Sequence, residues 1–119
     1  MMHLRLRRAF EAELSAARAD EGRGDYVAAW AHLERGHVLG QPFGIAHVRV
    51  HWRMLTFAVR RRDWTELIGQ LPRLLFAAPA TWLGRAPRGN TGGARVGMEQ
   101  PMPIPADLAA LLRTAREQP

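Results

Sequence analysis

Residues 25–61 decide the fold, and their sequence is DYVAAWAHLERGHVLGQPFGIAHVRVHWRMLTFAVRR. Apolar residues recur at helical spacing over about 26–39, and Asp25 is placed to cap that helix. The composition of residues 40–44 (GQPFG) indicates a turn. A second apolar repeat predicts a helix over about 45–61, with this stripe facing the core: Ile45, Val48, Trp52, Leu55 and Val59. Two helices joined by so short a turn form a helical hairpin.

Further helices are predicted on both sides of this hairpin. Apolar residues and alanines repeat at helical spacing over about 3–21. After the hairpin, Asp63 followed by Glu66 makes a capping box, which opens a fourth helix that continues to about residue 83. The apolar residues of this helix are Trp64, Leu67, Ile68 and Leu71. Pro72 is expected to kink or restart that helix, because proline lacks the backbone N–H that a helix interior needs.

Residues 84–105 contain five glycines and four prolines, which indicates a long irregular segment. Within it, Asn90-Thr91-Gly92-Gly93 is interpreted as a tight structural turn. A short C-terminal helix is predicted over 106–117. We therefore predict an all-α fold, a small bundle of about four to five helices arranged as hairpins. One domain is expected over 1–119, with a helical core over 3–83.

The composition of the chain excludes several classes of protein. None of its 119 residues is cysteine, so disulfides, cysteine zinc fingers and thiol catalysis are ruled out. Ser15 is the only serine and has no histidine at helical spacing, which argues against covalent hydrolase chemistry. No uninterrupted apolar run suggests a signal peptide or membrane span, so a cytoplasmic location is expected. The four tryptophans are predicted to lie in the core.

All 17 basic residues are arginines, and the net charge is +6. Such a balance permits an anionic partner. However, the only basic run is Arg60-Arg61-Arg62, and aromatic residues do not alternate with basic ones as they do in stacking platforms. The pattern does not favour nucleic-acid binding.

Histidines and glutamates fall on or beside the faces that the first three helices are predicted to bury. These residues are Glu13, Glu34, His37, His47 and His51. Glu34 and His37 are three apart, and His47 and His51 are four apart, so each pair lies on one side of its helix. Glu-x-x-His pairs hold metals in helical bundles. Because burying such groups is costly without a partner, a metal between the helices is our leading hypothesis.

Three nitrogen and two oxygen ligands, without sulfur, suit a divalent transition metal: zinc, iron, manganese, nickel or copper. A small protein that senses, buffers or delivers such an ion is predicted, and enzymatic activity is not. A structural role for the same residues stays open at this point. Inward histidines can hydrogen-bond within a core, Glu13 can pair with an arginine, and Glu34 can pair with Arg35 or Arg49. His32 is expected to point outward.

A weak internal repeat supports a second hypothesis. Gly24-Asp25-Tyr26 and Arg62-Asp63-Trp64 each open a predicted helix at a spacing of about 38 residues, close to the tetratricopeptide period of 34. The chain would then be a protein-interaction module of tetratricopeptide-like hairpins. An acidic partner would dock on the basic side that carries Arg49, Arg53 and Arg60, and the histidines would be structural.

Several motifs together resemble a family of short bacterial proteins, domain-of-unknown-function family 3703. The stretches that carry the resemblance are His32–Gln41, His47–Leu55, Arg61–Trp64, Gly89–Gly93 and Pro101–Pro105. The resemblance covers nearly the whole chain and implies no established activity and no assigned catalytic residues. It does imply an association with heavy-metal transport or resistance, which agrees with the metal hypothesis.

Overall fold

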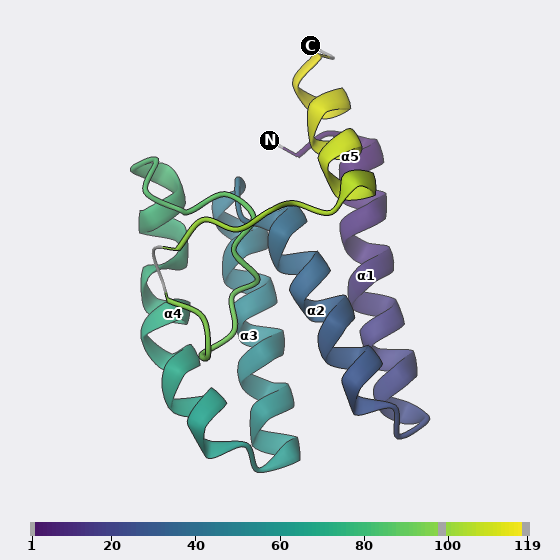
Figure 1. The fold of residues 1–119 in the computed structure, drawn as a ribbon, viewed down its shortest axis with the longest axis vertical. Coiled ribbons are helices and arrows are strands. Elements are labelled where there is room, and N and C mark those ends of the chain that lie inside the picture. The colour runs from purple at the N-terminus through teal and green to yellow at the C-terminus, as the bar shows by residue number, and fades with distance from the viewer. Residues whose placement is uncertain (1, 98–99, 118–119) are drawn as a thin grey trace.

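The structure, a computed structural model, describes residues 2–97 and 100–117 and is all-α within them. Its five helices are α1 (Leu4–Gly22), α2 (Tyr26–Gly40), α3 (Gly44–Arg61), α4 (Trp64–Trp82) and α5 (Ala106–Glu117). α1 packs mainly against α2 and α3 against α4, which gives two adjacent antiparallel hairpins, with α5 beside α1 and α2 (Figure 1). This is the small helical bundle predicted from the sequence. The pairing of the helices differs from the predicted hairpin of 26–39 and 45–61, since α2 packs mainly against α1 and α3 mainly against α4. Within the described residues, no helix has both the length and the apolarity needed to cross a bilayer.

Side-chain caps begin α2 and α4, as the sequence predicts. The Asp25 carboxylate accepts a hydrogen bond from Ala28 N at 3.1 Å, and the Asp63 carboxylate accepts one from Glu66 N at 3.1 Å. Each bond satisfies a backbone donor that the first turn of a helix leaves free. α4 continues through Pro72 as one helix, so the helix does not restart at this proline.

The main apolar core lies between α1, α2 and α3. Its largest fully buried side chains include Leu6, Phe10, Leu14, Leu39 and Met54. Gly40 allows α1 and α2 to approach closely here, since a Cβ on this residue would lie 2.7 Å from the Phe10 ring. This core holds α2 and α3 in a fixed relation, which places the candidate site.

The buried face of α3 differs from the predicted stripe. Ile45, Trp52 and Val59 are 77%, 55% and 49% exposed, whereas the buried set contains His47, Val50, His51, Met54 and Ala58. The prediction holds for Leu55, which is 9% exposed, and is wrong for these three residues, because the helix is rotated relative to the predicted orientation. The structure instead buries the histidine side of α3, where the rings find partners on α2 and α4.

α4 shows the same inversion. Its buried residues are Glu66, Gln70 and Ala77, while Leu71, Leu75 and other apolar side chains face outward. The tryptophan prediction was correspondingly wrong for Trp52, Trp64 and Trp82, which are all more than half exposed. Trp30 is the one that packs against the core. The physical reason is that polar groups on the inner face of α4 are hydrogen-bonded to the histidines and to the following segment.

The described residues between α4 and α5 form no regular helix or strand and cross the face of the bundle toward α5 (Figure 1). Several hydrogen bonds hold this segment against α2 and α4, one of them from Arg73 to Val96 O. Asn90 O accepts from the His37 ring, Gly92 O accepts from Gln70, and Ala94 N donates to Glu66 at 2.6 Å. Asn90-Thr91-Gly92-Gly93 is therefore a turn that lies directly on the histidine-bearing helices.

Candidate metal centre

Three histidine side chains converge between the two hairpins. His37 comes from α2, while His47 and His51 come from successive turns of α3. The Nε2 atoms are 3.0 Å apart for His37 and His51, and 3.2 Å apart for each of the other two pairs. All three residues are 4% exposed or less. We call this cluster the histidine triad.

The outer ring nitrogen of His51 is held by Gln70 of α4. His51 Nδ1 lies 2.7 Å from Gln70 Oε1, and Gln70 Nε2 donates to Gly92 O at 2.8 Å. The opposite amide orientation would place an oxygen against the Gly92 carbonyl, so Gln70 presents its oxygen to the ring. His51 Nδ1 must then carry the proton and donate it.

His47 is fixed in the same way by Thr81, near the end of α4. His47 Nδ1 lies 2.8 Å from Thr81 Oγ1, and that hydroxyl donates to Gln41 O at 2.6 Å. A threonine hydroxyl has a single proton to donate. Since Gln41 receives it, Thr81 accepts from His47, and His47 Nδ1 is also protonated.

His37 donates to the segment that crosses the bundle. Its Nδ1 lies 2.6 Å from Asn90 O, and a carbonyl can only accept. Gly92 closes over the same ring, with φ +84° and so little space that a Cβ would lie 2.5 Å from His37 Cδ2. Glycine is required there both for the backbone conformation and for the close approach.

The three Nδ1 protons leave each Nε2 as an unprotonated acceptor. Three lone pairs therefore meet at 3.0–3.2 Å with no hydrogen to place between them when the rings are neutral. A cation at the meeting point removes this conflict. Metal–nitrogen bonds of ~2.0–2.1 Å at tetrahedral angles place ligand nitrogens about 3.3–3.4 Å apart, so small adjustments bring the triad to zinc geometry.

Burial keeps the three histidines in the neutral form that binds a metal. Burial lowers the pKa of His47 to about 4 and that of His51 to about 3. Burial also holds the pKa of His37 well below its usual 6.5, with smaller contributions from His51 and His47. The lone pairs are thus available without competition from protons near neutral pH.

A cavity of about 340 Å³ is bordered by all three histidines. The remainder of its wall comes from Gln41, from the C-terminal half of α4 and from residues 83–92, including Phe76, Leu83 and Pro87. Two arginines, Arg73 and Arg85, also line it, and no aspartate or glutamate does among the described residues. A metal on the triad would therefore have room for another ligand on the cavity side.

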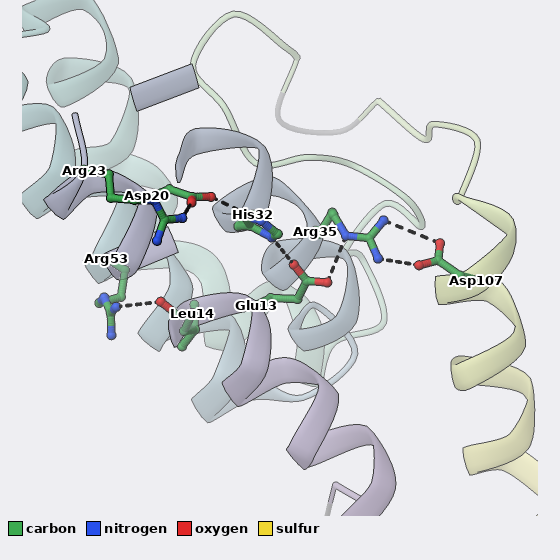
Figure 2. A network of polar contacts seen from close by, with 8 residues as sticks. All are labelled: Glu13, Leu14, Asp20, Arg23, His32, Arg35, Arg53 and Asp107. Carbon is green, nitrogen blue, oxygen red and sulfur yellow. Dashed lines mark hydrogen bonds and ion pairs between the residues drawn. The ribbon is translucent and has the colours of Figure 1, made fainter. Parts of the chain in front are cut away.

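The structure places Glu13, a predicted ligand, in a different network (Figure 2). Its two oxygens contact His32 Nδ1 at 2.7 Å and Arg35 Nε at 2.9 Å. Arg35 continues to Asp107 of α5, so the network ties α1, α2 and α5 together (Figure 2). The expected outward position of His32 is corrected to a partly buried one, because this pairing holds it against α1.

The other predicted carboxylate, Glu34, also lies outside the triad. Burial raises the pKa of Glu34, while a hydrogen bond with Thr91 acts in the opposite direction. Neither anticipated arginine is its partner, since Arg35 binds Glu13 and Asp107, and Arg49 binds Glu11. Of the five predicted ligands, the structure brings together the three histidines.

The arginines of the predicted docking side all contact α1 of the same chain. Arg49 pairs with Glu11, Arg60 pairs with Glu21, and Arg53 donates to Leu14 O at 3.2 Å. These contacts hold α3 against α1 of the first hairpin. Docking of an acidic partner on this side stays a prediction.

Sequence reasoning missed the residues that orient the triad. Gln70 and Thr81 lie on a helix whose apolar repeat drew attention to its other face, and Asn90 acts through a backbone carbonyl that no side-chain motif reveals. The only available signal was the pair Glu66 and Gln70, polar residues four apart in an otherwise apolar stretch.

Comparison with known proteins places the chain in a family. No curated protein and no solved structure matches the chain. A family described as protein of unknown function (DUF3703) matches residues 4–112, a range that contains the whole triad and every group that orients it. This chain belongs to that family.

Proposed function

We propose that this protein binds one divalent transition-metal ion through Nε2 of His37, His47 and His51. One observation carries the proposal: the unprotonated Nε2 atoms of three buried histidines lie together. The Nδ1 proton of each of these histidines is donated to a different acceptor. A histidine with a purely structural role in the core does not require two other histidines beside its unprotonated ring nitrogen. Metal-binding histidines, in contrast, commonly donate their second ring nitrogen to a carbonyl, an amide or a hydroxyl.

The donor set narrows the choice of metal. Three neutral imidazoles, with no thiolate and no carboxylate in the cluster, suit zinc, copper(II), nickel or iron better than the oxygen-seeking ions. The close spacing of the nitrogens favours a tetrahedral cap, so zinc is the first candidate. Glu13 and Glu34 are omitted from the proposed ligands because their carboxylates have other partners.

A role in metal homeostasis or resistance is the biological context that we infer from this site. The support is chemical: near neutral pH the triad holds neutral ligands, so binding does not require the release of ligand protons. A buffering or delivery protein needs such a site.

Elemental analysis of protein purified without a histidine tag tests the proposal, together with uptake of zinc by chelator-treated protein. We expect about one equivalent of metal, lost in a His37→Ala/His51→Ala double variant. His32→Ala is the matched control, since this histidine lies outside the triad. Circular dichroism checks that each variant is folded, and His47→Asn gives a milder change if the double variant is not. Wild-type protein that neither carries nor takes up zinc, copper, nickel or iron would refute the site.

A further inference from the structure

The charge of a loaded triad would be unbalanced. Three neutral imidazoles leave the 2+ charge of the ion intact, and within the described residues no carboxylate lines the adjoining cavity. A buried charge without compensation is costly, so the site calls for an anion.

Arg73 adds to this positive charge. Arg73 lines the cavity, and its guanidinium donates to Gly69 O at 2.8 Å and to Val96 O at 2.5 Å, which are neutral acceptors. Glu66 is the acidic residue that acts electrostatically on Arg73. The Glu66 carboxylate accepts a hydrogen bond from Ala94 N at 2.6 Å, and Gln70 Nε2 lies 3.5 Å from it.

Arg85 lies at the exposed side of the same cavity, beyond the end of α4. Its side chain is exposed and its position borders the space that opens from the triad. The cavity therefore has a cationic site at its inner end and arginines on its wall.

Most of the remaining wall is apolar, although Gln41 and Asn90 also border the cavity. Phe76, Ala80, Leu83 and Pro87 border a space of about 340 Å³ that opens to solvent, where Phe76 and Leu83 are 52% and 71% exposed. One water or hydroxide on the metal occupies only ~30 Å³, so the apolar wall leaves room for a larger ligand. The volume is at the lower end of the range for small-molecule sites, roughly 300–1,000 Å³.

We infer that the open coordination position takes the carboxylate of a small organic acid, whose compact apolar body occupies the cavity beside Phe76, Leu83 and Pro87. The carboxylate supplies the missing negative charge to the metal, with Arg73 and Arg85 favouring the same sign. This inference rests on the proposed function, because it requires the metal.

Cobalt(II) substitution gives a direct test, because the visible absorption of cobalt reports changes in its coordination. Sodium benzoate is the probe, and benzamide is its neutral counterpart of similar shape. We expect saturable spectral changes with benzoate and none with benzamide. Acetate should bind about tenfold more weakly than benzoate, since it leaves the apolar wall uncovered.

Charge reversal locates the binding site. Arg85→Glu should weaken benzoate binding by about threefold to thirtyfold, a range set by the exposure of this arginine. Arg88→Glu is the matched control, because Arg88 is exposed and does not line the cavity, so the change in net charge is the same. Its effect should stay within about twofold.

The possible failures are distinguishable. Protein that takes up no cobalt refutes the metal site, and the inference fails with it. Protein that takes up cobalt but shows no response to benzoate up to its solubility limit refutes the inference and leaves the metal site standing. Equal responses to benzoate and benzamide, or equal effects of Arg85→Glu and Arg88→Glu, also refute it.

Discussion

Replacing Gln70 by methionine is expected to weaken metal binding without removing any metal ligand. Methionine keeps the length and most of the volume of glutamine but has neither the oxygen that receives His51 Nδ1–H at 2.7 Å nor the amide that donates to Gly92 O at 2.8 Å. Gln70 is 0% exposed, so water does not replace either bond. A buried polar group left without a partner costs about 1–3 kcal/mol.

The metal-free variant can recover part of this loss. Without Gln70 to receive its Nδ1 proton, His51 can shift to the tautomer that is protonated on Nε2. That proton can be donated to Nε2 of His37 at 3.0 Å or of His47 at 3.2 Å, which relieves the conflict of lone pairs. We therefore expect a loss of about 1–3 kcal/mol in the free energy of unfolding, the cost of one orphaned group. The same tautomer blocks a ligand, so metal affinity should fall about 10–100-fold.

Competition with a chromophoric zinc chelator measures the affinity, and urea unfolding of the metal-free protein measures the stability. The same substitution at the exposed Gln100 is the control. Wild-type zinc affinity in Gln70→Met would show that the amide does not set the tautomer of His51. The reasoning about the three lone pairs would then fail.

Three further results are expected. Gly92→Ala should reduce stability by about 1–3 kcal/mol more than Gly84→Ala in thermal unfolding, because both residues have positive φ but only at Gly92 does a Cβ meet the triad; equal losses would contradict the packing argument. The stability of the metal-free protein should fall as the pH drops below about 6.5, since the unfolded chain binds protons that His47 and His51 accept in the folded state only near pKa values of about 4 and about 3. The slope in urea unfolding should reach at most about 1.4 kcal/mol per pH unit for each histidine, and it should flatten in a His47→Asn/His51→Asn variant. Glu13→Gln should cost about 1 kcal/mol through its contact with α2 while leaving the metal content unchanged, and loss of metal would restore Glu13 as a ligand.

The helices themselves could be predicted from the sequence because local signals mark their ends. Asp25 and Asp63 cap the helices that follow them, and glycines interrupt the chain between them. These signals act over a few residues, and the structure bears them out. The orientation of α3 and α4 could not be predicted in this way. An apolar stripe shows which face of a helix can be buried, but the face that is buried depends on what the neighbouring helices offer.

The histidines of the triad could be predicted from the sequence, since the spacing of His47 and His51 already places both rings on one side of α3. The carboxylates were not, because their partners are set by tertiary contacts. Glu13 meets Arg35 only once α1 and α2 have packed together. The groups that orient the rings are harder still to foresee, since a backbone carbonyl such as Asn90 O has no side-chain signature.

The inverted faces of α3 and α4 and the triad have one physical cause. α4 directs Glu66 and Gln70 inward, toward the crossing segment and His51, and leaves Leu71 and Leu75 outside. A hairpin built in this way gains less from apolar burial than the hairpin of α1 and α2. Its association with the rest of the bundle depends more heavily on polar contacts, each of which contributes only ~1 kcal/mol on average. The proposed metal would cross-link α2 to α3 and, through the oriented rings, connect them to α4 and the crossing segment, which would add to this stabilisation. The polar interior of the second hairpin thus agrees with the proposed metal site.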